Sequence, residues 1–343
     1  MQFTLEKEEI ILIRFGTIGT GAITERFIGG AIETGELQLT AIYSRDLGKA
    51  KKLREHFQDS ILSDVSYYTD LEALAISDDI DAIYIASPNS YHIKQALLFL
   101  SHGKHVLVEK PAASNLEELK IATALAKEKN LVFFEGMKSL TMPAYTALKD
   151  NLQRIGKARK FIGNYCQYSS RYDRHKNGEW VNTFQNEFSN GALMDIGVYC
   201  VYPLLDLFGS PNEIKAMGTI LENGGVDGSG SMLLSYPGLE ATLTYSKISD
   251  SFIGSEIQGE KGSLLIDKIG SPLKITLILR DGTREIFEPE TSVNDFYYEA
   301  KEFVKTIKSG NSFSSVHTEE LAHQVHDVMT KAREQINLVF PAD

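Results

Sequence analysis

A chain of 343 residues is longer than one hydrophobic core usually supports, because single cores stop growing at about 250–300 residues. Its composition, 43% hydrophobic and 24% charged, is typical of a soluble globular protein and excludes extensive disorder. The formal net charge of -11 argues against a nucleic-acid partner, since neutralising phosphates requires clustered Lys and Arg. We therefore expect two packed domains with a cleft.

The cysteines, histidines and N-terminus narrow the class further. Cys166 and Cys200 form no CxxC pair, and the eight His show neither HExxH nor a paired His–carboxylate spacing, so neither a disulfide framework nor a metal site is predicted. The opening MQFTLEKEEI carries acidic residues where a signal peptide would be basic. No uninterrupted apolar stretch reaches the roughly 18 residues of a membrane span. These features predict a cytoplasmic protein with no membrane partner.

Residues 1–137 alternate apolar runs with helical patterns, which is typical of β-α-β units and a doubly wound parallel sheet. Strands are expected at 10–16, 37–44, 82–86, 105–109 and 131–135. Helix boundaries are indicated by Asp46 before residues 47–57, by Gly103 after 91–102, and by a capping box of Ser114 with Glu117. We expect an N-terminal Rossmann domain.

Residues 138–343 show a different pattern, in which strands separated by turns follow one another without intervening helices, and this pattern predicts a C-terminal α+β domain with a large open, mostly antiparallel sheet. A helix is expected near 144–153, a long strand from 157 into a polar loop, and an apolar helix from 191 to Gly209. From 213 to about 289 the turn signals NGG, YPG, GEKG and RDG separate strands. Helices near 295–308 and 318–335 complete the pattern.

A glycine-rich turn follows the first predicted strand. Read as GxGxxG, it supplies Gly19 and Gly21 but has Thr24 where a third glycine would allow close helix–strand packing. Its place between a strand and a helix favours a dinucleotide site, where a pyrophosphate meets a helix N-terminus. The alternative is a glycine turn required only by backbone geometry. The cofactor-binding residues predicted here are Gly16, Thr17, Gly19, Thr20, Gly21, Ala22 and Ile23.

The end of the second strand bears on the choice of dinucleotide. An NAD-binding protein would usually offer Asp or Glu there to the ribose hydroxyls, whereas this chain has Ser44 and Arg45, with Lys49 close by. Arg and Lys favour a 2′-phosphate, so NADP is preferred over NAD as the cofactor. In the alternative interpretation these cations are a solvated helix start.

Two further segments lie at carboxyl ends of predicted parallel strands, the edge where such sheets bind ligands. They are Ala86-Ser87-Pro88-Asn89-Ser90-Tyr91-His92 and Glu109-Lys110-Pro111. With the glycine turn, in this order and spacing, the chain resembles the Gfo/Idh/MocA oxidoreductases. The resemblance implies that Lys110 reaches the substrate oxygen, that the bond before Pro111 is cis, and that the cofactor is lined by Ala86, Ser87, Pro88, Asn89, His92 and Glu109. The alternatives are a packing role for His92 and a surface ion pair between Lys110 and Glu109.

The segment GALMDIGVY places Asp195 and Tyr199 four residues apart, on one face of a helix. This D-x-G-x-Y spacing resembles the tyrosine subgroup of the family, which includes dimeric dihydrodiol dehydrogenase and glucose–fructose oxidoreductase. The chain departs from that subgroup at Trp180-Val181 and at Ser189-Asn190-Gly191, so the loop near the substrate differs. The candidate substrate residues are Lys138, Arg171 and Trp180; in the alternative interpretation Arg171 and Trp180 are exposed loop residues.

Hydride transfer at a carbinol needs a group that moves the hydroxyl proton, and an ordinary Tyr has a pKa of about 10. We expect the ammonium of Lys110 to favour the tyrosinate of Tyr199, with Asp195 orienting the phenol or the substrate; otherwise Tyr199 is an interior aromatic. The sequence thus predicts an NAD(P)-dependent enzyme acting on a CH–OH group of a sugar, polyol or trans-dihydrodiol. The alternatives are a non-catalytic dinucleotide-binding regulator and, less favoured, a methyltransferase. The resemblance implies a homodimer or higher oligomer formed through the open sheet face.

Overall fold

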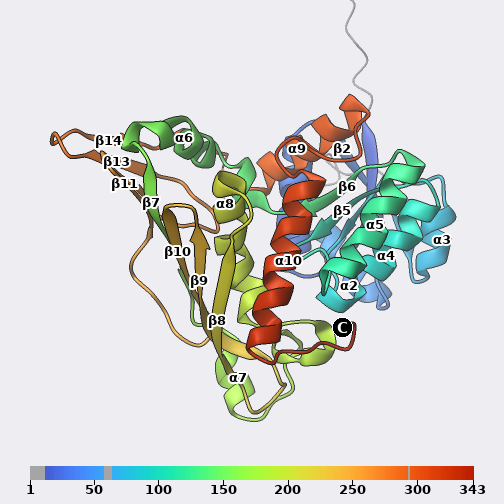
Figure 1. Ribbon diagram of the computed structural model, residues 1–343. Helices are drawn as coiled ribbons and strands as arrows, with labels where there is room; N and C mark the ends of the chain where they lie inside the picture. The colour runs from blue at the N-terminus through green and yellow to red at the C-terminus, as the bar shows by residue number, and fades with distance from the viewer. Residues whose placement is uncertain (1–11, 58–63, 293) are drawn as a thin grey trace, which may run out of the picture.

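A computed structural model describes residues 12–57, 64–292 and 294–343, and it places two sheets side by side with helices between them (Figure 1). The first sheet has the order β3-β2-β1-β4-β5-β6, with every neighbouring pair parallel. Its strands are β1 (Ile13–Ile18), β2 (Leu37–Tyr43), β3 (Ser66–Tyr68), β4 (Ala82–Ile85), β5 (His105–Glu109) and β6 (Phe133–Gly136). The predicted Rossmann sheet is confirmed; residues 10 and 11 of its first expected strand lie outside the described residues.

Five helices connect these strands: α1 (Ala22–Glu33), α2 (Leu47–Glu55), α3 (Leu71–Ile76), α4 (His92–Ser101) and α5 (Leu116–Lys129). Asp46 caps α2 as predicted, because its carboxylate accepts the N–H groups of Gly48 and Lys49. The capping box predicted at Ser114 is wrong by one residue: Asn115 caps α5 by accepting the Glu118 N–H. Asn caps helices as readily as Ser does, so the motif alone left the register open.

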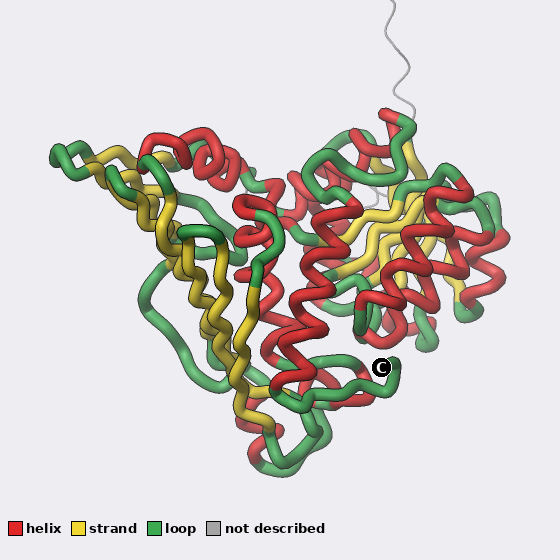
Figure 2. The backbone as a smooth tube through the Cα atoms, in the orientation of Figure 1, coloured by secondary structure: helices red, strands yellow, loops and turns green. Residues whose placement is uncertain are grey.

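The second sheet has the order β14-β13-β12-β11-β7-β10-β9-β8, in which β7 and β10 pair in parallel and the other neighbours are antiparallel. This confirms the predicted mostly antiparallel sheet, drawn in yellow beside the first one in Figure 2. Its strands are β7 (Ala158–Cys166), β8 (Glu213–Ile220), β9 (Asp227–Tyr236), β10 (Leu239–Ser246), β11 (Ser255–Gly259), β12 (Gly262–Ile266), β13 (Ile275–Leu279) and β14 (Arg284–Phe287).

Helices cover one face of the second sheet. They are α6 (Pro143–Asn151), α8 (Val198–Phe208) and α10 (Glu319–Gln335), with the short α7 (Tyr172–Lys176) in a loop below (Figure 1). By length and hydropathy, the segment Asn186–Phe208 would be long enough to cross a membrane, but 72% of its apolar window is buried inside the protein. It is therefore the core helix of the second domain.

The last connection of the chain returns to the first domain. Helix α9 (Phe296–Ser309) packs Phe296 and Phe303 into the core formed by Phe27 and Tyr84. Gly30 permits this approach, because a Cβ there would lie 2.6 Å from the backbone nitrogen of Tyr297. The C-terminal part of the chain thus contributes to both domains.

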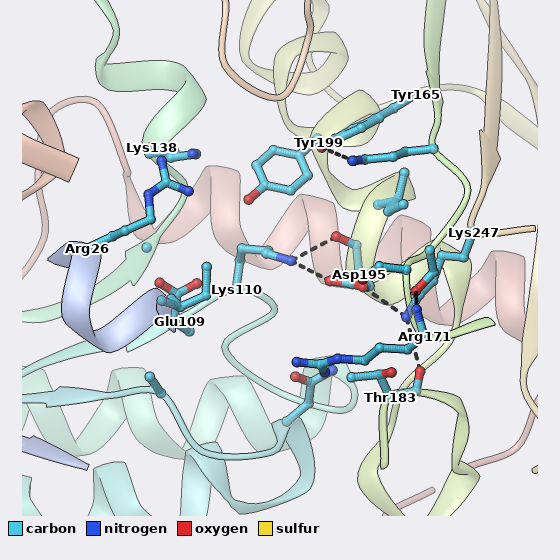
Figure 3. A pocket seen from close by; sticks show the side chains of 18 of the residues that line it. Arg26, Glu109, Lys110, Lys138, Tyr165, Arg171, Thr183, Asp195, Tyr199 and Lys247 are labelled. Atoms are coloured by element: carbon cyan, nitrogen blue, oxygen red, sulfur yellow. Dashed lines mark hydrogen bonds and ion pairs between the residues drawn. The ribbon is translucent and has the colours of Figure 1, made fainter. Parts of the chain in front are cut away.

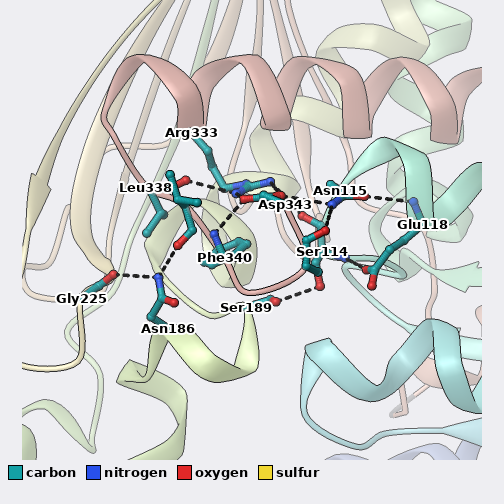
Figure 4. A network of polar contacts seen from close by, with 12 residues as sticks. Ser114, Asn115, Glu118, Asn186, Ser189, Gly225, Arg333, Leu338, Phe340 and Asp343 are labelled. Atoms are coloured by element: carbon teal, nitrogen blue, oxygen red, sulfur yellow. Dashed lines mark hydrogen bonds and ion pairs between the residues drawn. The ribbon is translucent and has the colours of Figure 1, made fainter.

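A polar network joins the two domains near α10 (Figure 4). The guanidinium of Arg333 binds the carboxylate of Asp343 and donates to the carbonyl of Ser114, 3.1 Å away. The hydroxyl of Ser114 lies 2.8 Å from that of Ser189, in the loop before α8. This loop therefore meets the start of α5, which fixes one edge of the space between the domains.

Candidate active site

Two adjacent cavities, each of about 550 Å³, lie at the carboxyl edge of the parallel sheet. The first, here called the turn cavity, is bounded by Gly19 and Thr20 and by the end of β2. The second, the interdomain cavity, is bounded by the end of β5, the start of α8 and the end of β10. Ala86 and Ser87 line both, so the two cavities are continuous at the end of β4.

The glycine turn has the geometry of a phosphate-binding turn. Gly19 has a φ of +112°, and a Cβ there would lie 2.7 Å from the carbonyl oxygen of Ala86, so only glycine fits. Gly21 starts α1, and among the described residues no side chain caps that helix and no atom lies within 4 Å of the Cβ position. Its first backbone N–H groups therefore face open space, where an anion would be favoured.

Other residues predicted from this turn lie around it. Gly16 and Thr17 are buried inside β1, where a Cβ on Gly16 would meet Ile80 and Ile83 at 3.2 Å, so they support the turn rather than line a cavity. Ala22 is exposed at the first position of α1. Ile23 lines the interdomain cavity.

The cations at the end of β2 line the turn cavity, as does Ser44. Arg45 is exposed, and Lys49 lies 4.0 Å from Asp46, too far for a tight ion pair. Asp46 also borders this cavity, but its carboxylate is engaged as the cap of α2. A further cation, Lys94 on α4, borders the same space and was not predicted.

The three residues predicted to be catalytic meet in the interdomain cavity. The Lys110 ammonium lies 2.9 Å from a carboxylate oxygen of Asp195 and 5.0 Å from the centre of the Tyr199 ring (Figure 3). It also donates to the backbone carbonyl of Asp195 at 2.8 Å. The peptide bond between Lys110 and Pro111 is cis, as the resemblance implied. An amine from the first domain and a phenol from the second thus face one cavity.

The helix that carries Asp195 and Tyr199 begins with a wide turn. Leu193–Gly197 is π-helical and leads directly into α8, and such turns frequently occur at functional sites. The N–H of Leu193 donates to the buried carboxylate of Asp227 at 2.8 Å. A Cβ on Gly191 would lie 2.0 Å from Asp227, which explains the glycine before this turn.

A second lysine, missed by the sequence analysis, completes the cluster. The ammonium of Lys247 lies 2.9 Å from the other carboxylate oxygen of Asp195, with its side chain only 3% exposed. It follows β10, in which Ala241, Leu243 and Tyr245 point into the core, so an inward position falls on Lys247. A lysine at an inward position of an alternating strand was the signal that would have revealed it.

Burial and these ion pairs set the protonation states. Burial disfavours the charged form of Asp195, but Lys110 and Lys247 hold the pKa of its carboxyl well below the usual range. Burial also disfavours the ammonium of Lys110, but Asp195 and Tyr199 raise its pKa above the ordinary value. Burial raises the pKa of Tyr199 and outweighs the opposing effect of Lys110. The net direction of the shift is therefore opposite to the one expected from Lys110 alone, because burial of the phenol outweighs one shared ammonium.

Glu109 and His92 have structural partners. Glu109 accepts a hydrogen bond from the Tyr84 hydroxyl at 2.5 Å, and burial raises the pKa of its carboxyl, so it forms no surface ion pair with Lys110. The buried ring of His92 lies 2.9 Å from the carbonyl of Pro111 and 2.8 Å from that of Ser87, and burial lowers its pKa. Both residues border the interdomain cavity, and His92 links the two loops.

The remaining predicted residues divide between the cavities and the surface. Pro88 lines the turn cavity, while Asn89 lines the interdomain cavity and donates to the carbonyl of Ser189 at 3.0 Å. Lys138, paired with Asp295, and Arg171 also line the interdomain cavity. Trp180 lies outside both cavities; its side chain is 62% exposed, because the neighbouring Val181 is the residue that packs into the core.

Comparison with known proteins agrees with this arrangement. Residues 13–137 match the oxidoreductase family with an NAD-binding Rossmann fold, and residues 151–265 match the GFO/IDH/MocA C-terminal domain. The chain belongs to the Gfo/Idh/MocA oxidoreductases. It is 45% identical to the scyllo-inositol 2-dehydrogenase (NADP(+)) of Bacillus subtilis over 97% of this chain and 99% of that one. This family member is therefore an NAD(P)-dependent oxidoreductase.

Two further relatives are more distant. The trans-1,2-dihydrobenzene-1,2-diol dehydrogenase of Mus musculus is 29% identical over 96% of this chain and 99% of the mouse enzyme. The 3-ketoreductase KijD10 of Actinomadura kijaniata, solved with NADP and TDP-benzene, superposes with a TM-score of 0.83 at 25% identity, covering 95% of this chain and 98% of that one. The two-domain arrangement is thus shared along nearly the full length.

Proposed function

We propose that this protein catalyses the reversible, NADP-linked oxidation of a secondary alcohol on a cyclic polyol of the inositol class. The observation that carries the proposal is the Lys110–Asp195–Lys247 cluster, in which the Lys247 side chain is buried and that of Asp195 is 40% exposed, and which faces a phenol in a cavity continuous with a dinucleotide-type turn. The high identity to a scyllo-inositol dehydrogenase favours a ring polyol over the sugars and dihydrodiols that the sequence also allowed. The cavity, about 550 Å³, has room for such a ring.

The donor set of the turn cavity fits a phosphorylated dinucleotide. Gly19, Thr20 and the start of α1 would hold the pyrophosphate, and Ser44, Arg45 and Lys49 would hold the 2′-phosphate. The bound nicotinamide would supply or accept the hydride. Two carboxylates, Asp46 and Glu72, also border this cavity, but Asp46 caps α2, and the three cations Arg45, Lys49 and Lys94 outnumber them, which supports NADP over NAD.

The chain's own residues handle the proton and the charge. Because burial raises the pKa of Tyr199, its phenol is suited to donate a proton to a carbonyl oxygen during reduction; in oxidation the same oxygen, as phenolate, would take the proton from the substrate hydroxyl. The ammonium of Lys110, fixed by Asp195, would stabilise negative charge on the same oxygen. Arg171 and Thr183 border the cavity and would contact other hydroxyl groups of the ring.

We further propose a cytoplasmic homo-oligomer built through the open face of the second sheet. Met217 on β8 and Leu233 on β9 are 79% and 59% exposed and point away from the helices, since their strand neighbours Ala216, Met232 and Leu234 face the core. A second copy would cover this face. Light scattering of the purified protein, compared with a Met217→Glu, Leu233→Glu variant that should dissociate, tests the proposal.

A cofactor titration followed by a substrate screen tests the proposed activity. NADPH and NADH binding are measured by fluorescence quenching, and oxidation is then followed at the absorbance band of reduced nicotinamide with inositols, sugars and trans-dihydrodiols. Saturable turnover of an inositol with NADP supports the proposal. Tight NADPH binding without turnover of any polyol would overturn it and favour the regulatory alternative.

A further inference from the structure

We propose that Lys247 is a positioning residue for the reaction, acting through Asp195 to keep a net positive charge at the ammonium of Lys110. The inference rests on the proposed function, since it concerns the charge presented to the substrate oxygen. It assigns a role to a buried lysine that lies far in sequence from the motifs carrying the other two members of the cluster.

The contacts define one carboxylate shared by two ammonium groups. Lys110 binds one oxygen of Asp195 and Lys247 binds the other, each at 2.9 Å (Figure 3). Lys247 is fixed further by donating to the carbonyl of Thr183 at 3.0 Å and by lying 4.7 Å from the centre of the Phe184 ring. The ammonium therefore has a single well-defined position.

The backbone of Lys247 is held equally firmly. Its N–H donates to the carbonyl of Gly228 and its carbonyl accepts from Ser169, both at 2.8 Å, so strands or loops flank it on both sides. A burial this complete is costly for a lysine unless the charge is paired, and Asp195 is the partner. Lys247 is thus a second cation bound to a carboxylate that already has Lys110 as an ion-pair partner.

The consequence is a difference in net charge. A Lys110–Asp195 pair would be neutral, and the carboxylate would draw the ammonium away from a substrate oxygen. With Lys247 the three groups sum to +1, so Lys110 keeps attraction for an oxygen that becomes negative during hydride transfer. Arg171 also lines this cavity, but it lies in the loop before α7 and is not a member of the three-residue cluster.

The arrangement also predicts a pH dependence, because the two lysines hold the pKa of Asp195 well below its usual range. Loss of Lys247 removes one of the two opposing charges, so the carboxyl would protonate at a higher pH. The ionisable groups that face this cluster from the packed elements are Glu109, Lys110, Tyr165, Tyr199 and, against Lys247 itself, Asp227. Both tyrosines have a raised pKa, so neither titrates on the acid side; the carboxyls of Glu109 and Asp227 also have raised pKa values and therefore titrate at higher pH than Asp195.

The test compares Lys247→Met with Lys247→Arg and with Lys331→Met, which removes an exposed lysine from α10. We expect Lys247→Met to lower kcat by about 10- to 100-fold, the range of a lost charge-stabilising group, with KM and NADPH affinity changed less than about threefold. The acid limb of its kcat profile, where Asp195 protonates, should lie at higher pH than in wild type, and Lys247→Arg should restore most of both properties. Wild-type kcat and pH profile in Lys247→Met would overturn the inference.

A measurement on the ligand-free protein separates this inference from the proposed function. A depressed carboxyl pKa contributes stability that is fully present above the unfolded value of about 4 and is lost as the pH falls towards the folded value, so the Tm gap between wild type and Lys247→Met should narrow only below about pH 4. The gap for Lys331→Met should stay constant. If no polyol is turned over, the proposed function fails, while this measurement still tests whether Lys247 holds the charge of Asp195; a Tm gap for Lys247→Met that stays constant below about pH 4 overturns the inference.

Discussion

The turn cavity and the interdomain cavity adjoin, yet they are built by different means. The turn cavity uses backbone geometry at Gly19 and exposed cations, with the Lys49 side chain 70% exposed. The interdomain cavity uses charges drawn from three distant elements: the side chains of Lys110 and Lys247 are only 11% and 3% exposed, and that of Asp195, which both lysines bind, is 40% exposed. Exposed charges each contribute little and tolerate change, whereas removing one member of a buried set leaves the others unpaired. The two cavities should therefore differ sharply in sensitivity to substitution.

The largest effect is expected for Lys110→Met. It removes the ammonium that faces the substrate oxygen and leaves Asp195 with one partner, so kcat should fall by about 1,000-fold or more. Stopped-flow or steady-state kinetics with the best polyol from the screen measure the loss. NADPH affinity should stay within about threefold, because the turn cavity is untouched. Activity within tenfold of wild type would remove Lys110 from the proposed chemistry.

Tyr199→Phe tests the proton-moving group and should lower kcat by about 100-fold or more, the usual contribution of a positioned acid or base. The raised pKa of Tyr199 also fixes a sign: the phenol stays protonated through neutral pH, so reduction should show no loss of rate between pH 7 and pH 9. A decline centred near pH 7–8 that disappears in Tyr199→Phe would instead indicate the tyrosinate. The phenylalanine keeps the ring packed against Tyr165, so folding should be preserved.

The same contrast explains what the sequence could predict. The turn at Gly19 and the pair Asp195 and Tyr199 each belong to a short contiguous motif, so the spacing of residues in the sequence was enough to predict where they lie. Lys247 shares no motif with them, and only strand alternation marks it as inward. The protonation state of Tyr199 depends on the balance of burial against one ammonium, which spacing does not contain. Trp180 was predicted to contact the substrate, but its neighbour Val181 packs against Phe184 and Trp180 is left exposed outside both cavities, a choice that composition and spacing do not contain.

In the turn cavity, the double variant Arg45→Ala, Lys49→Ala should weaken NADPH binding by about 10- to 100-fold, as expected for the loss of two cations from one phosphate. NADH lacks the 2′-phosphate, so its affinity should change less than about threefold. Fluorescence titration of both coenzymes gives the ratio, and kcat at saturating NADPH should be nearly unchanged. Equal weakening of both coenzymes would show that these cations do not select NADP.

The smallest effect on kcat is expected at Asp227, which supports the interdomain cavity without lining it. A substitution there tests whether a buried charge outside the cluster is as sensitive as one within it. Its carboxylate accepts the Leu193 N–H, but its other oxygen has no hydrogen-bond partner among the described residues, and burial raises its pKa to about 6. A pKa raised above the unfolded value means that the folded state binds the proton more tightly. This residue therefore lowers stability as the pH rises from about 4 to above 6.

Asp227→Asn removes the charge while its amide oxygen still accepts the Leu193 N–H. Relative to wild type, its free energy of unfolding should improve by roughly 1–3 kcal/mol between pH 4 and pH 8, from about 1.4 kcal/mol for each unit of pKa shift. Urea unfolding at several pH values measures the change. Because the turn that carries Asp195 is preserved, kcat should stay within a few-fold of wild type, unlike Lys110→Met. A pH-independent stability difference would mean that Asp227 is ionised in the folded protein with a carboxyl pKa close to the unfolded value. The fold would then stabilise this buried negative charge as it stabilises the charge of Asp195.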